Sequence, residues 1–298
     1  MTPDWIAADW GTSALRVWAM RGDSVLAEAQ SADGMGRLGQ DGFEPALLRL
    51  IGGWLTGAPL PVIACGMVGA RQGWSEAAYR AVPCPPLGLP FHRVEPADPR
   101  FTLHILPGLS QTTPPDVMRG EETQIAGFLQ GRPVFEGTLC LPGTHTKWVH
   151  VRAGKVARFQ TCMTGELFAL LSGQSVLRHG LDEGWDDTAF TTAVAEAAAN
   201  PARLGTDLFA IRARGLLGSF APGAARARLS GLLIGLELAA TCAIWQGGPV
   251  VLIGAGGLSR HYAIALSTLN CTAEVTDGTE ITLAGLCAAH RLLKEAAT

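Results

Sequence analysis

Charge, paired cysteines and long hydrophobic runs are all scarce in this sequence. Charged residues make up only 16% of the 298 residues and the formal net charge is −3, so we expect no nucleic-acid-binding surface. The most apolar stretch, residues 232–245, carries Glu237 and is shorter than the roughly 20 residues of a membrane span, which predicts a core helix and no membrane partner. The N-terminus lacks a basic region and an apolar signal core, and therefore predicts no export signal.

Cysteine usage excludes two kinds of structural crosslink. The seven cysteines stand singly and mostly in apolar surroundings. The absence of any CxxC pair argues against zinc, and the odd count argues against a full set of disulfides. We therefore expect buried free thiols and a cytoplasmic location.

Two familiar nucleotide motifs are also missing. No GxxxxGK[ST] sequence occurs, which excludes a P-loop kinase as far as motifs allow. GMGRLG at residues 34–39 matches GxGxxG, but no acidic residue follows at the ribose-binding distance, and Gly42 comes before any helix begins. We therefore do not expect a Rossmann dinucleotide site.

Hydrophobic patterning predicts an α/β protein. Strands are expected at residues 5–9, 14–20 and 24–30, and again at 61–66, 101–106 and 249–254. Helices are expected at 44–55, 119–129, 187–200, 225–246, 258–269 and 281–297. Six prolines in residues 83–100 predict an extended loop there.

The pattern of the first thirty residues recurs in the middle of the chain. A second block beginning at Thr138 again gives strand, Gly-Thr turn, strand, glycine turn and strand. At an offset of 132 residues (143 − 11), Gly11-Thr12 falls on Gly143-Thr144 and Gly22 falls on Gly154. A repeat at this spacing predicts two similar domains, which we place at residues 1–135 and 136–298, with the C-terminal helix able to pack back on the first.

An acidic turn, DWGTS, follows the first predicted strand. The hydroxyls of Thr12 and Ser13 and the backbone N–H groups suit phosphate oxygens, and Gly11 allows close backbone approach. Mg²⁺ prefers a carboxylate with water and phosphate oxygens, which makes Asp9 the candidate metal ligand. Arg16 is a candidate phosphate contact. An ordinary hairpin turn uses the same residue types, so the motif alone leaves both interpretations open.

The corresponding turn in the second block, PGTHTKW, lacks the acid, because Leu141 stands at the position equivalent to Asp9. This asymmetry favours an arrangement in which one loop binds the metal and the β-phosphate and a facing loop binds the γ-phosphate. A third turn, Gly254-Ala255-Gly256-Gly257, lies between a strand and a helix and suits a flat ligand lying on the backbone. The predicted phosphate contacts of the second turn are Gly143, Thr144, His145, Thr146 and Lys147.

The order of these three turns resembles the actin-like sugar-kinase superfamily, with two phosphate loops and an adenosine loop. The resemblance implies ATP bound in a cleft between two domains. Related carbohydrate kinases place a Gly-Asp before the second loop, with the aspartate as base. Here Gly120-Glu121 stands 22 residues before it (143 − 121), which departs from that pattern and leaves Glu122 and Asp116 as rivals for the role.

The substrate pocket is expected around residues 65–79, CGMVGARQGWSEAAY. Small residues there, with Gly66 and Met67, admit a ligand, and Trp74 follows. Arg71 and Arg119 are candidates for binding a substrate carboxylate, although either residue could form a structural ion pair instead.

The combination of ADWGTS, GMGRL, ACGMVGARQGW, DVMRGEETQ, LPGTHTKWV and TGELFALL resembles the 2-dehydro-3-deoxygalactonokinase family, over residues 5–177 and more loosely beyond. The resemblance implies a two-domain actin-like ATPase (ribonuclease H-like) fold with an interdomain cleft. It also implies ATP- and Mg²⁺-dependent phosphorylation of a small sugar acid, 2-dehydro-3-deoxy-D-galactonate, at its C6 hydroxyl. Asp9 and Glu121 would then be catalytic, and Glu122 would lie near the substrate.

Three alternatives stay open on the sequence. The gluconate epimer could be the preferred substrate, or the same loops could serve a phosphatase that uses water as the nucleophile. A sugar sensor of this fold would usually carry a basic helix-turn-helix segment, which we do not find. The sequence leaves open whether two copies associate as a homodimer.

Overall fold

The computed structural model describes residues 2–218, 220–254 and 256–296, which form two compact units. The first unit contains the described residues through Phe135, the segment Arg152–Arg158 and the described residues from Gly278 onward. The second unit contains Glu136–Val151 and the described part of Phe159–Asp277. The C-terminal helix therefore belongs to the first unit.

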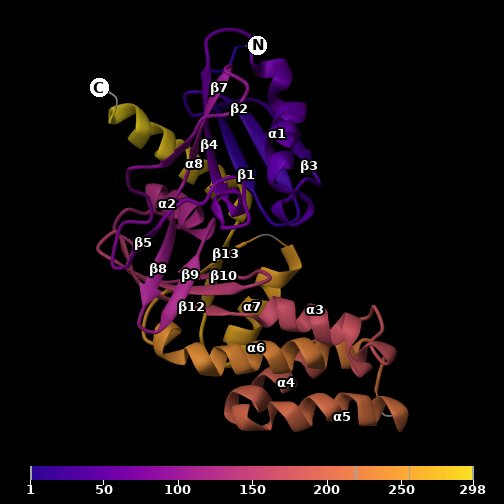
Figure 1. The fold of residues 1–298 in the computed structure, drawn as a ribbon. Helices are drawn as coiled ribbons and strands as arrows, with labels where there is room; N and C mark the ends of the chain where they lie inside the picture. The colour runs from indigo at the N-terminus through magenta and orange to yellow at the C-terminus, as the bar shows by residue number, and fades with distance from the viewer. Residues whose placement is uncertain (1, 219, 255, 297–298) are drawn as a thin grey trace. The chain divides into compact units, whose positions relative to one another are not determined.

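A six-stranded sheet forms the centre of the first unit. Its inner strands are hydrophobic on both faces because helices cover both sides. Along β1, Ile6, Ala8 and Trp10 face the side of helix α1 (Phe43–Ile51), whereas Trp5 and Ala7 face helix α8 (Gly278–Glu295). Figure 1 shows α1 and α8 on opposite sides of these strands. In order across the sheet the strands are β3 (Ser24–Ser31), β2 (Leu15–Arg21), β1 (Trp5–Trp10), β4 (Leu60–Gly66), β7 (Phe101–Ile105) and β6 (His92–Val94).

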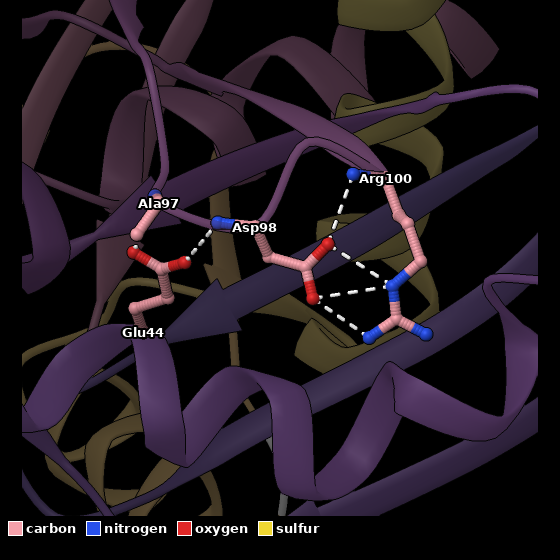
Figure 2. A network of polar contacts seen from close by, with 4 residues as sticks. All are labelled: Glu44, Ala97, Asp98 and Arg100. Carbon is pink, nitrogen blue, oxygen red and sulfur yellow. Dashed lines mark hydrogen bonds and ion pairs between the residues drawn. The ribbon is translucent and has the colours of Figure 1, made fainter.

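The proline-rich segment is more ordered than its composition indicates. The prediction of a loop throughout residues 83–100 is wrong at β6, which pairs antiparallel with β7. Glu44 of α1 anchors the following turn, because its carboxylate accepts the N–H groups of Ala97 (2.9 Å) and Asp98 (2.7 Å) (Figure 2). Asp98 in turn binds the Arg100 guanidinium, and these hydrogen bonds lower the pKa of Asp98. Side-chain acceptors thus satisfy the backbone N–H groups of Ala97 and Asp98, which lie between two prolines and outside the strands.

The second unit repeats the strand order of the first. Its five-stranded sheet begins with a hairpin and continues with parallel strands, as the first sheet does, and this repeated order is that of the actin-like fold. Gly22 and Gly154 occupy equivalent turns, with φ of 54° and 69°. The predicted internal repeat is therefore confirmed. Across this sheet the order is β12 (Lys155–Cys162), β11 (Thr146–Arg152), β10 (Gly137–Leu141), β13 (Val250–Ile253) and β14 (Ala273–Thr276).

Helix α6 (Ala224–Trp245) is the central element of the second unit. Gly231 and Gly235 bring it against α4 (Asp187–Ala199), since a Cβ atom on Gly231 would lie 2.4 Å from Phe190 O. Within the described residues, α6 is long and apolar enough to cross a membrane, but 67% of its most apolar stretch is buried in the unit, as in a core helix. Patterning missed α3 (Thr164–Gln174) and α5 (Leu204–Leu216), whose apolar residues do not form a clean stripe.

The remaining elements are short or lie outside the two sheets. Helix α2 (Glu121–Gly131) packs on α8, and α7 (Gly256–Thr268) follows β13. A separate three-stranded sheet has the order β5 (Tyr79–Ala81), β8 (Gly108–Thr112) and β9 (Pro115–Met118). The 3-10 turns are η1 (Met35–Arg37), η2 (Gln40–Gly42), η3 (Gly52–Trp54), η4 (Met67–Gly69), η5 (Val176–His179) and η6 (Pro201–Arg203).

The contact between α2 and α8 predicts a strong difference between two glycines of one helix. A Cβ atom on Gly127 would lie 1.9 Å from Ile281 O, whereas Gly131 has open space around it. Gly127→Ala should therefore destabilise the protein by about 1–3 kcal/mol, because one helix must move. Gly131→Ala is the matched control. Urea unfolding measures both, and equal midpoints for the two variants would contradict the packing described.

Candidate active site

The segment that follows β3 packs against the backbone of the DWGTS turn. The N–H group of Gly36 donates to Thr12 O (2.9 Å). A Cβ atom on Gly34 would lie 2.3 Å from the backbone of Ser13, so this position accepts no larger residue. The GMGRLG segment, which includes η1, therefore supports the first turn.

Thr12 and Ser13 project from this turn into solvent, and both are exposed. Among the described residues, no hydrogen bond within the chain uses the backbone N–H group of either one. Two hydroxyls and two backbone donors are thus available to an anion such as a phosphate.

Asp9 lies next to the end of β1, directly opposite Arg16 of β2. The Nη2 atom of Arg16 is 2.5 Å from Oδ2 of Asp9, and the Asp9 side chain is 18% exposed. Its Oδ1 atom accepts a weak hydrogen bond from the Cys65 thiol, at 3.8 Å. Arg16 therefore holds the candidate metal ligand in place, a role that the sequence did not indicate.

The donors around Asp9 fit Mg²⁺ that arrives with a nucleotide. Within the part of the chain that the structure describes, no three His, Cys, Asp or Glu side chains cluster closely enough to hold a metal ion. Mg²⁺ keeps several waters and commonly uses one or two carboxylates together with substrate phosphates. A single, partly exposed carboxylate beside a turn with free N–H donors matches that requirement.

Two glycines bring the start of α2 to the same end of the sheet. In the parallel pairing of β1 and β4, Trp10 lies beside Gly66. A Cβ atom on Gly66 would lie 2.6 Å from Trp10 O, and one on Gly120 would lie 3.3 Å from the Gly66 Cα. Their φ angles, 89° and 106°, are ones that other residues adopt only with strain. The backbones of the three segments are therefore in direct contact.

The surroundings of Cys65 show which carboxyls this contact brings together. Burial raises the pKa of the Cys65 thiol, and the charges of Asp9 and Glu122 raise it further. Both acids therefore lie around one buried thiol, which follows from the register of Asp9 with Cys65 and from the position of α2.

The two glutamates at the start of α2 differ sharply in exposure. Glu121 is half-buried, and its Oε2 atom accepts the Arg119 N–H group at 3.1 Å. Glu122 has no exposed surface, and its Oε2 atom accepts the Gly120 N–H group at 2.7 Å. Burial, followed by the charge of Glu121, raises the pKa of Glu122 to about 8. Glu122 is thus mainly protonated at neutral pH, and Glu121 has the accessible carboxylate. Asp116, the weaker rival, lies in β9.

Arg119 is a buried cation with unpaired donors. Its side chain is 9% exposed, its Nη2 atom donates to Ala77 O at 2.6 Å, and its guanidinium carbon lies 4.3 Å from the Tyr79 ring centroid. The Nε and Nη1 atoms are buried without a hydrogen-bond partner. Because buried polar groups are nearly always paired, these two donors fit a planar anion such as a carboxylate.

The other predicted substrate residues lie in varied settings. Met67 is half-buried, and Arg71 is exposed. Trp74 packs against the rings of Trp10, Phe43 and Phe101, so much of its surface belongs to the core. A substrate contact by Trp74 stays a prediction.

The second Gly-Thr turn is supported by the start of α3. A Cβ atom on Gly165 would lie 2.3 Å from Gly143 O, and the Glu166 N–H group donates to Thr144 O at 2.9 Å. His145 is exposed, and its Nε2 atom lies 2.6 Å from Oε2 of Glu166. The TGE of the TGELFALL motif therefore fixes this turn.

Two of the predicted phosphate donors lie beneath the turn. Thr146 has no exposed surface, and its hydroxyl lies 2.8 Å from the Tyr262 hydroxyl. Lys147 is 6% exposed. Thr144 and His145 of the turn are exposed, and Gly143 is half-buried.

A cavity of about 390 Å³ lies beside this turn, within the second unit. The rings of Trp185 and His261 stack in its wall with centroids 4.0 Å apart, and the Arg226 guanidinium lies 5.2 Å from the Phe168 ring centroid. Apolar walls with a few polar groups are typical of small-molecule sites. The lining residues are Gly143, Thr144, Thr164, Gly165, Phe168, Trp185, Arg226, Ser230, Leu233, Ile234, Leu258, His261 and Tyr262.

The third glycine turn lies next to this cavity. Gly254 follows β13, and its N–H group donates to Thr276 O at 3.1 Å. Gly256 begins α7 with φ of 74°, and Gly257 is exposed. Ala255 lies outside the described residues. Leu258, one residue further on, lines the cavity.

Sequence reasoning missed most of the cavity. Arg226, Trp185 and His261 belong to no sequence motif. They are far apart in the chain, and the packing of the helices brings them together in the cavity wall. A signal was available for Glu237, as a single acid inside an apolar helix, but the sequence does not show what lies around it.

The raised pKa of Glu122 predicts a pH-dependent stability. Between about pH 4.5 and 8 the folded state holds the carboxyl proton and the unfolded state releases it. Stability should therefore fall as pH rises through this window, with a slope of up to about 1.4 kcal/mol per pH unit from this group. Glu122→Gln should flatten the profile, whereas exposed Glu76→Gln should leave it unchanged. Denaturant unfolding across this pH range measures it, and parallel profiles for wild type and Glu122→Gln would contradict the assignment.

A family model and two related proteins of known name all match this chain over nearly its whole length. The family model described as 2-keto-3-deoxy-galactonokinase matches residues 9–289. The chain is 41% identical to a Rhizobium meliloti protein named "Probable 2-dehydro-3-deoxygalactonokinase", covering 96% of both chains. It is 32% identical to the Escherichia coli 2-dehydro-3-deoxygalactonokinase, covering 96% of this chain and 97% of the other.

A solved structure agrees with these sequence relationships. The crystal structure of a Sinorhizobium meliloti protein named "putative 2-dehydro-3-deoxygalactonokinase" superposes on this chain with a TM-score of 0.90. The two sequences are 40% identical, and the match covers 97% of this chain and 99% of the other. The chain belongs to the 2-keto-3-deoxy-galactonokinase family.

Proposed function

We propose that the protein catalyses ATP-dependent phosphorylation of 2-dehydro-3-deoxy-D-galactonate at the C6 hydroxyl, giving the 6-phosphate and ADP. The observation that carries the proposal is the contact that gathers Asp9, at the end of β1, and the Glu121–Glu122 pair at one end of the first sheet. Relatives named for this reaction support the choice of substrate.

The two turns supply phosphate contacts in this proposal. The free N–H groups and hydroxyls of Thr12 and Ser13 bind phosphate oxygens at the first turn, and Gly143 and Thr144 do so at the second. Asp9 would hold Mg²⁺, directly or through water, and the chemistry supplied by the bound ion would be neutralisation of charge on the transferring phosphoryl group. Arg16 keeps the Asp9 carboxylate in position.

Glu121 accepts or orients the proton of the attacking hydroxyl. Phosphoryl transfer passes through a loose transition state, so the chief task of the protein is to place the hydroxyl in line and to take its proton. Glu121 is accessible and its backbone is fixed by the Gly66–Gly120 contact, whereas Glu122 is fully buried. We therefore assign the base role to Glu121 and a supporting role to Glu122.

Arg119 recognises the carboxylate of the sugar acid in this assignment. Its Nε and Nη1 donors would bind carboxylate oxygens of the substrate, which accounts for two buried donors that lack a hydrogen-bond partner among the described residues. The adenosine of ATP occupies the cavity beside the second turn, where Trp185, Phe168 and Arg226 offer flat surfaces and Leu258, after the third glycine turn, lines the wall. All seven cysteines lie within the described residues and are present as thiols, which supports a cytoplasmic location.

A coupled assay of ADP release tests the proposal. Mg-ATP is supplied with 2-dehydro-3-deoxygalactonate, with its gluconate epimer, or with no sugar. We expect turnover that depends on the galactonate form. A preference for the epimer would change the substrate, and phosphate release without dependence on sugar would contradict a kinase.

Substitution of the two residues assigned to catalysis, Glu121 and Asp9, tests their roles in the same assay. Glu121→Gln should lower kcat by about 10²–10⁴-fold, the usual worth of a general base. Asp9→Ala should cost a similar amount, since it removes the metal ligand. Near-normal turnover in both folded variants would exclude the assigned roles.

A further inference from the structure

A buried carboxyl lies at the centre of the second unit. Glu237 of α6 is 3% exposed. Its Oε1 atom accepts the Trp148 indole N–H group at 2.6 Å, and its Oε2 atom accepts the Tyr262 hydroxyl at 2.9 Å and the Thr164 hydroxyl. Three elements, β11, α7 and α3, therefore converge on one side chain.

These partners connect Glu237 to the second turn and to the cavity. The Tyr262 hydroxyl also lies 2.8 Å from that of Thr146, which directly follows the exposed Thr144 and His145. Thr164 and Tyr262 line the cavity, and the residue after Thr164 packs against Gly143. A change at Glu237 thus reaches both parts of the proposed nucleotide site without any direct contact.

We propose that Glu237 is a positioning residue that sets the affinity of the second turn and its cavity for nucleotide phosphates, through the hydroxyl chain Tyr262–Thr146 and through Thr164. This inference rests on the proposed function only in taking a nucleotide as the ligand of that site.

The hydrogen-bond chemistry explains how this control operates. The Trp148 indole can only donate, so Oε1 is always an acceptor. When Glu237 is ionised, both the Tyr262 and the Thr164 hydroxyls donate to Oε2, and Thr146 donates to the Tyr262 oxygen. When Glu237 is protonated, Oε2 donates to one of these hydroxyls, which must turn its own hydrogen elsewhere. Either the Thr146 or the Thr164 hydroxyl then becomes a free donor next to the phosphate site.

Ionisation of Glu237 should lower nucleotide affinity through its charge as well as through its hydrogen bonds. Burial raises its pKa to about 7, against the hydrogen bonds from Thr164, Trp148 and Tyr262. The other titratable groups near it are Tyr262 on α7 and Cys140 on β10, with Cys162 of β12 beside Cys140. Burial raises the pKa of Tyr262 and of Cys140, so both are neutral near pH 7. Ionised Glu237 also repels phosphate, so nucleotide affinity should fall as pH rises through about 7.

The test compares Mg-ADP affinity in wild type and in Glu237→Gln by titration calorimetry, at about pH 6 and about pH 8.5 without sugar. The amide stays neutral at both pH values. Over this range wild-type affinity should fall by about fivefold or more relative to that of Glu237→Gln, in which only the other titrating groups, including the nucleotide, contribute. The comparison cancels the titration of the nucleotide itself, because both proteins bind the same ligand.

Two further variants separate positioning from a general loss of stability. Tyr262→Phe keeps the ring and removes the hydroxyl link, so it should reduce the pH dependence. Thr241→Val lies one turn away on α6, where its hydroxyl bonds only to the Glu237 backbone carbonyl among the described contacts, and should keep the wild-type dependence even if stability falls. In sugar-dependent turnover, Glu237→Gln should change KM for ATP and leave KM for the sugar acid unchanged.

The outcomes distinguish this inference from the proposed function. Wild-type pH dependence retained in both Glu237→Gln and Tyr262→Phe would overturn the inference while kinase turnover stands. If the affinity for Mg-ADP depends on Glu237 but no sugar-dependent turnover occurs, the inference is supported and the proposed reaction is contradicted. No binding of Mg-ADP by wild-type protein would contradict both.

Discussion

The close backbone contact between Gly66 and Gly120 is the constraint on which the first half of the site depends. A Cβ atom on Gly66 would clash with Trp10 O, one on Gly120 would lie tightly against the Gly66 Cα at 3.3 Å, and both positions have backbone angles that favour glycine. The contact places the start of α2 against the ends of β1 and β4. As a result the half-buried Glu121 and the metal-binding candidate Asp9 lie at the same end of the sheet, although 112 residues (121 − 9) separate them in the sequence.

Each unit also buries one glutamate beneath its candidate site. Glu122 lies in the first turn of α2 with a pKa of about 8, and Glu237 lies beneath the second Gly-Thr turn with a pKa of about 7. A buried carboxyl weakens the fold when it ionises, but its hydrogen bonds fix several segments in one geometry. The hydrogen bonds of Glu237 reach the support of the second turn, whereas those of Glu122 fix the opening of α2 beside Glu121. The raised pKa values and the precise positioning of the site therefore have the same cause.

The sequence predicted the elements that local patterning controls. The two strand–turn–strand blocks, the Gly-Thr turns and the opening of α2 near Glu121 all follow from residue spacing. It did not predict the pairing of Arg16 with Asp9, the unpaired donors of Arg119, or the polar cluster around Glu237. These depend on contacts between residues far apart in the chain. The role of GMGRLG as a support for the first turn likewise emerges only when Gly34 is seen against Ser13.

The most direct test of this account is the activity of Gly66→Ala, measured together with its affinity for Mg-ADP and its near-ultraviolet circular dichroism. The added methyl group would lie 2.6 Å from Trp10 O, so the end of β4, against which Gly120 packs, must move away from β1. We predict a large loss of kcat in a folded protein that still binds Mg-ADP through the second unit. Near-wild-type turnover would show that catalysis does not depend on this contact, and would contradict the account.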